Sequence, residues 1–160
     1  MLSIAAARRE DVPLLLTLIR ELAEFEKLAH EVVATEPLLE DSLFGARPVV
    51  EAVLARVAGE AAGFALYYHN YSTFLGRAGL YLEDLYVRPE HRGHGVGHAL
   101  LAHLARLATG RGCGRLEWSV LDWNRRAVEF YESLGARPVA GWTVYRVSGD
   151  ALARLAAESS

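Results

Sequence analysis

The sequence predicts one α/β domain over residues 1–160, with a mixed sheet that carries helices on both faces. Two patterns support this. The early apolar segments follow one another through short turns, as in hairpins, whereas the later ones alternate with helical segments, as in crossovers. A chain of 160 residues with 52% hydrophobic and 23% charged residues also has the length and composition for one buried core. The expected order is βααβββαβαβ.

Local signals define the elements of the first half. Asp11 and Pro13 form a helix start, and apolar residues follow at helical spacing up to about Lys27. Thr35-Glu36-Pro37 starts a second helix that ends near Gly45. Strands are expected over 2–7, 49–58 and 62–71, with a hairpin turn at Gly59-Glu60.

The second half is expected to alternate strands and helices. Pro89 ends a strand, and Gly135 stands at the usual glycine position after a helix. The expected strands cover 79–88, 115–121 and 142–147, and the expected helices cover 96–109, 124–134 and 150–157.

Composition argues against several classes of protein. A net charge of −3 and a pI of about 6.1 do not suit a nucleic-acid binder. No apolar run approaches the ~18 residues of a membrane helix, and no basic segment precedes an apolar block at the start. The one cysteine, Cys113, has no disulfide partner in the chain. We therefore expect a cytoplasmic protein without nucleic-acid or membrane partners.

The segment Arg92-Gly93-His94-Gly95-Val96-Gly97-His98 lies between an expected strand and an expected helix. Glycines allow positive φ and close approach of a ligand, and a helix start offers free N–H groups to an anion. Phosphate is the natural occupant; the alternative is a tight turn without a ligand. A P-loop lacks its Gly-Lys-Ser/Thr here, and a dinucleotide fingerprint lacks its third glycine. We expect no metal site, because no Cys or Glu nearby completes a set with the turn's histidines.

Two carboxylates have positions suited to binding an amine. Glu83 is predicted to share a strand face with Tyr81, Leu85 and Val87, ten residues before the glycine turn, while Asp84 points to the other face as a structural residue. Glu26 continues the apolar helix stripe of Leu15, Ile19 and Leu22. The alternative for both glutamates is a solvated side chain.

The predicted helix 124–134 contributes further candidates. Tyr131 shares a stripe with Ala127 and Leu134, so its ring is expected to be buried with its hydroxyl on a polar partner. Asn124 is the expected N-cap. Arg125 and Arg126 either meet phosphate or face water.

The Arg92–Gly97 segment resembles the R-x-x-G-x-G signature of the GNAT acetyltransferase superfamily. Further segments resemble its diamine (spermidine/spermine) acetyltransferase family, and most closely the thialysine N-acetyltransferase branch. These segments are Glu21–Lys27, Tyr71-Ser72-Thr73, Tyr81–Asp84, Val120–Asn124 and Phe130-Tyr131. The resemblance extends from Ile4 to about Leu155 and implies a mixed, mostly antiparallel GNAT-like sheet, acetyl-CoA as cofactor, a primary amine as acceptor and a homodimer.

The resemblance also implies roles for individual residues. Tyr131 would be the proton donor. Independently of the resemblance, the position of Glu83 among apolar neighbours suits a general base that deprotonates the amine, directly or through water. Acceptor-binding positions fall on Phe25, Glu26 and Glu83. Coenzyme-binding positions fall on Leu85, Tyr86, Val87, Arg92, Gly93, His94, Gly95, Val96, Gly97, His98, Asn124, Arg125, Arg126 and Ala127.

Two departures concern the size of the acceptor. Val139-Ala140 precedes Gly141-Trp142, where the polyamine enzymes have an acidic residue, and Phe74 replaces a tryptophan. The expected activity is therefore acetyl transfer to a small cationic amine, such as a thialysine-like amino acid or a diamine or polyamine. The alternatives are another acceptor (a protein N-terminus, lysine or an aminoglycoside) or a non-catalytic acyl-CoA-binding module.

Overall fold

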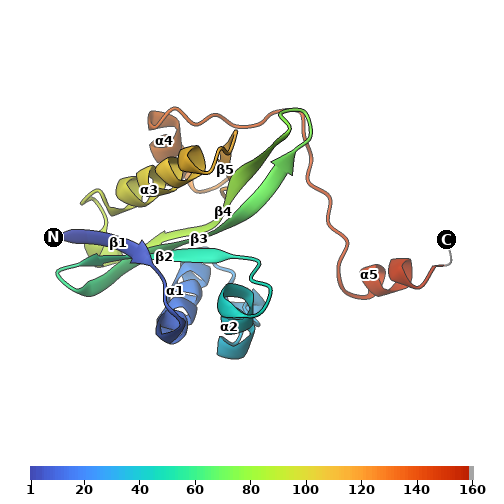
Figure 1. Cartoon of the computed structure of the whole chain (residues 1–160), viewed down its shortest axis with the longest axis horizontal. Coiled ribbons are helices and arrows are strands. Elements are labelled where there is room, and N and C mark those ends of the chain that lie inside the picture. The colour runs from blue at the N-terminus through green and yellow to red at the C-terminus, as the bar shows by residue number, and fades with distance from the viewer. Residues whose placement is uncertain (159–160) are drawn as a thin grey trace. The chain divides into compact units, whose positions relative to one another are not determined.

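The computed structural model describes residues 1–158, which divide into two compact units. The first unit is Met1–Leu121, and the second begins at Asp122. Figure 1 shows the elements of both units along the chain. The single domain over residues 1–160 stays a prediction.

The first unit contains a five-stranded sheet in the order β1-β2-β3-β4-β5. The first three pairings are antiparallel, and β4 pairs with β5 in parallel. This confirms the predicted mixed, mostly antiparallel sheet. The turn between β2 and β3 falls on Ala58-Gly59, one residue earlier than expected. The strands are β1 Leu2–Ala6, β2 Glu51–Val57, β3 Glu60–Ser72, β4 Arg77–Val87 and β5 Leu116–Trp118.

Helices cover both faces of this sheet. Figure 1 shows α1 (Val12–Phe25) and α2 (Glu36–Phe44) on one face and α3 (Val96–Gly110) on the other. The predicted caps explain two starts: Pro13 lies in the first turn of α1, and the Thr35 hydroxyl of α2 accepts a hydrogen bond from Leu38 N at 3.3 Å. On the α1 face, buried side chains of α1, α2, β2, β3 and β4 form one cluster that includes Leu15, Leu18, Phe64 and Tyr86.

The end of α1 has a defined hydrogen-bonded geometry. Leu28 N donates to Ala23 O at 2.8 Å and Lys27 N donates to Glu24 O at 3.1 Å, which is the Schellman pattern. Lys27 takes the left-handed conformation, with φ of 61°, that this pattern requires. The motif holds Glu26 at the C-cap.

A β-bulge interrupts β4 at Glu83. Leu66 pairs with Asp84 but the next residue, Tyr67, pairs with Leu82, so Glu83 is an extra residue on β4. Asp84 therefore lies on the sheet face of Tyr81, whose ring centroid lies 5.3 Å from that of Tyr68. The predicted common face of Tyr81, Glu83, Leu85 and Val87 is wrong, because the bulge breaks the alternation on which it rested; Leu85 and Val87 lie on the opposite face from Tyr81.

The two strands β4 and β5 pair over a short stretch only. Their partners are Leu80 with Leu116, Tyr81 with Glu117 and Leu82 with Trp118. Beyond Leu82, β5 does not pair with β4, so this edge of residues 83–87 has no neighbouring strand among residues 1–158. The strand predicted over 115–121 is only three residues long, because its pairing with β4 ends at Trp118.

The second unit contains α4 (Arg125–Ser133) and α5 (Gly149–Ala156), both as predicted. Gly135 has φ of 92° after α4, as the glycine signal indicated. The predicted strand 142–147 is wrong: the segment is not a strand, and its residues are exposed. Strand-forming residues need a paired edge, and the described part of the second unit contains no strand with which this segment could pair.

Candidate active site

The glycine turn has the backbone geometry that an anion site requires. Gly93 and Gly95 have φ of 79° and 80°, which L-residues rarely adopt. The first helical bond of α3 runs from Ala99 N to Gly95 O at 3.0 Å. The N–H groups of residues 96–98 precede this bond, so they have no partner within the helix and are available to a phosphate group.

The side chain of Arg92 folds back onto the preceding strand. Its Nε donates a hydrogen bond to Val87 O at 2.8 Å. Its guanidinium carbon lies 4.8 Å from the ring centroid of Phe25 and 5.6 Å from that of Tyr86. Both distances are within the range of cation–π contacts.

Three carboxylates gather where α1 ends against the bulge of β4. Burial and the charge of Glu83 raise the pKa of Glu26. Burial, then Glu83 and then Glu26 raise the pKa of Asp84 to about 7. Glu83 is exposed, whereas Glu26 and Asp84 are half-buried. The cluster thus holds a carboxyl that exchanges its proton near neutral pH.

Glu26 and Glu83 were predicted from the sequence as acceptor-site residues, whereas Asp84 was predicted to be a structural residue outside the site. The bulge accounts for the omission, because regular alternation sends two adjacent residues to opposite faces. The adjacent pair Glu83-Asp84 within an otherwise apolar strand was the available signal. A strand buried on both faces cannot solvate two neighbouring carboxylates, so one of them is desolvated.

An ion pair fixes α1 to the end of β4 beside this cluster. Arg88 donates from Nε to Glu21 Oε1 at 3.1 Å, from NH2 to Glu21 Oε2 at 2.9 Å, and from NH1 to Ala61 O at 3.3 Å. The Tyr86 hydroxyl donates to Glu21 Oε1 at 3.1 Å. None of these contacts was expected from the sequence. Tyr86, a predicted coenzyme residue, has its side chain buried beside this ion pair.

The remaining candidates belong to the second unit. Asn124 Oδ1 accepts a hydrogen bond from Ala127 N at 3.3 Å, so Asn124 is the predicted N-cap of α4. Arg125 and Arg126 are exposed. The prediction that Tyr131 is buried is wrong: its side chain is half-buried, and no residue of α4 is buried. The ring centroid of Tyr131 lies 5.6 Å from that of Phe130.

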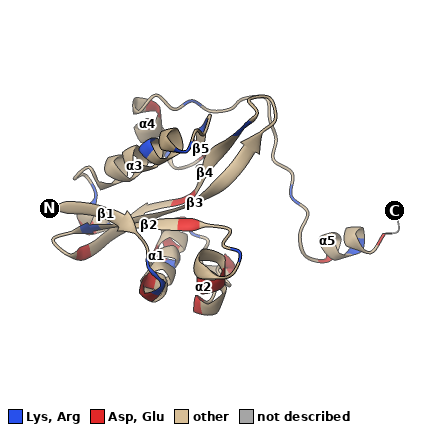
Figure 2. Ribbon diagram, viewed as in Figure 1, with Lys and Arg blue, Asp and Glu red and all other residues tan. Residues whose placement is uncertain are grey.

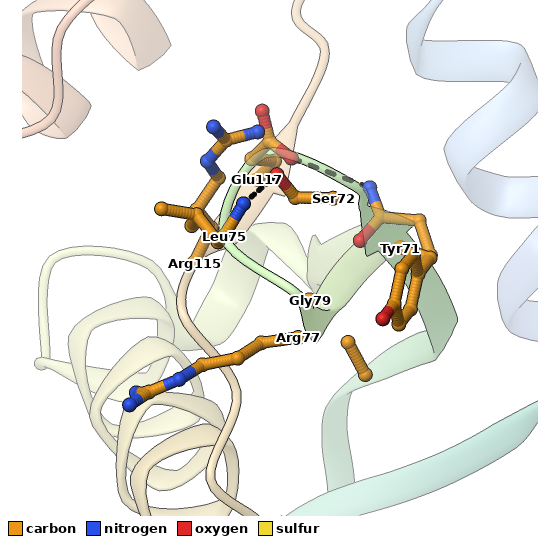
Figure 3. A pocket seen from close by; sticks show the side chains of 9 residues that line it. Tyr71, Ser72, Leu75, Arg77, Gly79, Arg115 and Glu117 are labelled. Carbon is orange, nitrogen blue, oxygen red and sulfur yellow. Dashed lines mark hydrogen bonds between the residues drawn. The ribbon is translucent and has the colours of Figure 1, made fainter.

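A small pocket lies at the far end of β4 from the glycine turn. Figure 3 shows its lining at the tip of the β3–β4 hairpin and at β5, with charges of both signs from Arg77, Arg115 and Glu117. Asn70 Nδ2 donates to Glu117 Oε1 at 3.3 Å. The pocket lining includes none of Glu26, Glu83 and Asp84, so the pocket is not part of the carboxylate cluster.

Residues 1–158 contain neither a metal-binding cluster nor a membrane-spanning helix. No group of three or more His, Cys, Asp or Glu side chains lies close enough together to hold a metal ion. No helix in that range has the length and apolar character that a membrane crossing requires.

Comparison with known proteins identifies the family. The profile of the Acetyltransferase (GNAT) family matches residues 16–136, which include the glycine turn and all three carboxylates. The chain belongs to this family and is a GNAT acetyltransferase. The resemblance inferred from the sequence is thereby confirmed.

Among curated relatives, a thialysine N-epsilon-acetyltransferase of Bos taurus is 41% identical over 96% of this chain and 96% of its own length. An L-ornithine N5-acetyltransferase of Arabidopsis thaliana is 33% identical over 93% of this chain and 85% of its own. Among solved structures, an integron cassette protein from the V. cholerae mobile metagenome superposes with a TM-score of 0.82 at 28% identity, covering 98% of both chains. The GNAT fold is thus confirmed.

Proposed function

We propose that this chain transfers an acetyl group from acetyl-CoA to the primary amine of a small cationic acceptor, such as a thialysine-like amino acid or a diamine. The observation that carries the proposal is the cluster of Glu26, Glu83 and Asp84, on the strand that leads into the glycine turn. Three carboxylates attract an ammonium group. Figure 2 shows further acidic residues along α1 and α2, which favour a cationic acceptor.

The residues present fit acetyl-CoA, which would supply the activated acetyl thioester. The N–H groups at the start of α3, with Gly93 and Gly95 in the turn, would hold the pyrophosphate. The open edge of β4 over Leu85–Val87 leaves strand backbone available for the pantetheine arm. The start of α4, from Asn124 to Ala127, would provide the second contact implied by the family resemblance.

Removal of the amine proton is assigned to the carboxylate cluster. An alkyl ammonium with a pKa near ~10 cannot attack a thioester until it loses a proton. Burial raises the pKa of Asp84 to about 7, so this carboxyl can accept a proton near neutral pH, with exposed Glu83 holding the ammonium. Glu83 binds the ammonium group, or takes up its proton, either directly or through a water molecule.

Tyr131 is proposed as the donor that protonates the departing thiolate. The support is the family resemblance at Phe130-Tyr131 and the half-buried position of the phenol on α4. Backbone N–H groups would stabilise the developing oxyanion. We propose direct transfer between bound substrates, because Cys113 lies in a turn, where its own N–H donates to Ala108 O, and no base in that turn is placed to activate its thiol.

Short acceptors are favoured over long polyamines. Val139-Ala140 before Gly141-Trp142 provides no acid for a second, distant ammonium, and Phe74 replaces a tryptophan of the polyamine enzymes. The names of the relatives above refer to thialysine and ornithine, both short amino acids with a side-chain amine.

The proposal includes a cytoplasmic homodimer. Its support is the exposed segment 142–147, in which Trp142, Val144 and Tyr145 are 79%, 87% and 94% exposed. A strand-forming apolar segment whose own unit offers no pairing strand among its described residues is suited to pairing with a second copy. Light scattering at micromolar concentration should give twice the 17.6 kDa chain mass, and a stable monomer would contradict the dimer.

A thiol-release assay over thialysine, ornithine, lysine, diamines, spermidine and spermine tests the function. We expect the highest kcat/KM with short cationic amines. The Glu26→Gln variant should raise the acceptor KM more than the coenzyme KM, because it removes a carboxylate from the acceptor side only. A clear preference for spermine would contradict the proposed acceptor class. Coenzyme binding without thiol release for any amine would favour a non-catalytic binding module.

A further inference from the structure

Arg92 begins the glycine turn, but its side chain contacts the acceptor side of the molecule. The guanidinium lies over the rings of Phe25 and Tyr86, and Nε donates to Val87 O at 2.8 Å. Within residues 1–158, no carboxylate oxygen lies within 4.0 Å of the Arg92 guanidinium nitrogens. The two rings and one carbonyl are therefore the groups that hold this cation in place.

Each of these contacts connects to a different part of the proposed site. Phe25 is the last residue of α1 and precedes Glu26 of the carboxylate cluster. Tyr86 is buried, and its hydroxyl donates to Glu21 of α1. Val87 ends the strand segment proposed to pair with the pantetheine arm.

The two rings differ in how firmly they are held. Tyr86 is 6% exposed and its position is fixed by the core, whereas Phe25 is 42% exposed at a helix end. A cation over both rings therefore restrains Phe25 by means of Tyr86. Phe25 and Glu26 are consecutive residues, so a restrained Phe25 also restricts the position of Glu26.

We propose that Arg92 is a positioning residue that ties the acceptor-binding end of α1, at Phe25 and Glu26, to the glycine turn. The inference rests on the proposed function and adds a coupling between the binding of acetyl-CoA and the binding of the amine acceptor. In this coupling the coenzyme orders the glycine turn, the turn positions Arg92, and Arg92 positions Phe25. Lysine is a weaker replacement, because it lacks both the planar group that lies over the two rings and the Nε–H that donates to Val87 O.

The Arg92→Lys variant tests this inference through a split between kinetic constants. We expect the acceptor KM to rise roughly five-fold, in keeping with the loss of a cation–π contact, while the coenzyme Kd from calorimetry changes less than about two-fold. Arg20→Lys is the matched control, since Arg20 is exposed on α1 and should change neither constant. A mainly weakened coenzyme Kd would overturn the inference and make Arg92 a phosphate ligand.

A double-mutant cycle with Phe25→Leu tests the route of the coupling. If Arg92 acts through the Phe25 ring, then Arg92→Lys in the Phe25→Leu background should leave the acceptor KM unchanged. Independent, multiplying effects of the two substitutions would overturn the inference. If Arg92→Lys does not fold, Arg92→Gln is measured in the same cycle, because its planar amide can still reach Val87 O.

A spectroscopic measurement separates this inference from the proposed function. The Nε–H resonance of Arg92, assigned by its absence in Arg92→Lys, should move when Phe25 becomes leucine, because ring current and hydrogen bonding both change. This holds whether or not any amine is acetylated. An unmoved resonance would reject the Arg92–Phe25 contact, whereas absent thiol release from the wild type with every amine would reject the proposed function alone.

Discussion

Arg88 holds Glu21 at two points, with Nε 3.1 Å from Oε1 and NH2 2.9 Å from Oε2. The hydrogen bonds and charge of Arg88 lower the pKa of the Glu21 carboxyl. Because Glu21 lies on α1 and Arg88 directly follows β4, this pair aligns the helix that carries Glu26 with the strand that carries Asp84.

The Glu21→Gln substitution should therefore destabilise the first unit. A glutamine keeps the shape of the side chain but replaces a charge-assisted pair, and the expected loss is about 1–3 kcal/mol in denaturant unfolding. The folded-state pKa is lowered, so this stabilisation is present above the ordinary value of 4.5 and is lost as the pH falls below it. Glu24→Gln, on the exposed side of α1, is the control. Equal unfolding midpoints of wild type and Glu21→Gln at pH 7 would contradict the role.

Two substitutions at Gly95 separate backbone strain from anion binding. Its φ of 80° strains any L-residue, so Gly95→Ala and Gly95→Glu should each lose about 1–2 kcal/mol of stability, although no atom lies within 4 Å of an added Cβ. Only the glutamate places a negative charge where phosphate oxygens belong. Calorimetry should show a much weaker coenzyme affinity for Gly95→Glu than for Gly95→Ala, and equal affinities would remove the phosphate assignment.

The Asp84→Asn substitution should reveal a stability difference that depends on pH. The folded-state pKa of Asp84 is about 7 against an ordinary value of 3.8, so the folded state retains a proton that the unfolded state has lost. Wild-type stability therefore falls as the pH rises between these values, by up to about 4 kcal/mol, and the asparagine variant escapes this loss.

Urea unfolding of both proteins at pH 4.5 and pH 8 measures this effect. The variant should gain stability relative to the wild type at pH 8, and the difference should shrink toward pH 4.5. Activity should fall in the same variant, because the proposed proton acceptor is gone. A stability difference that is the same at both pH values would show that Asp84 titrates normally.

The Tyr131→Phe substitution tests the proton donor, because it keeps the ring and removes only the hydroxyl. If the hydroxyl protonates the thiolate, kcat should fall by roughly 10²–10⁴ while the coenzyme affinity stays near that of the wild type. A structural tyrosine would instead lose about 1 kcal/mol of stability with little change in turnover. Tyr145→Phe removes a hydroxyl from a ring that is 94% exposed and is the control. Full turnover in Tyr131→Phe would assign the acid to a water molecule.

Most of the element order was predictable from the sequence, because caps, glycines, prolines and apolar spacing act between near neighbours. The Thr35 cap, the glycine turn before α3 and the Asn124 cap follow local rules of this kind. Glu26 was placed correctly at the end of the apolar stripe of α1, since a helix carries its period from one turn to the next.

Tertiary structure alone decided the features that depend on partners distant in the chain. The bulge at Glu83 arises from the register of β4 on β3, and it places Asp84 beside Glu26, where burial and neighbouring charge raise its pKa to about 7. The family resemblance placed Arg92 among the coenzyme-binding positions, but the rings of Phe25 and Tyr86 determine where its guanidinium lies. The segment 142–147 has the composition of a strand, but the described part of its own unit offers no strand to pair with. Composition sets what a segment can form, whereas pairing, desolvation and charge–charge contact exist only once the chain has brought its distant parts together.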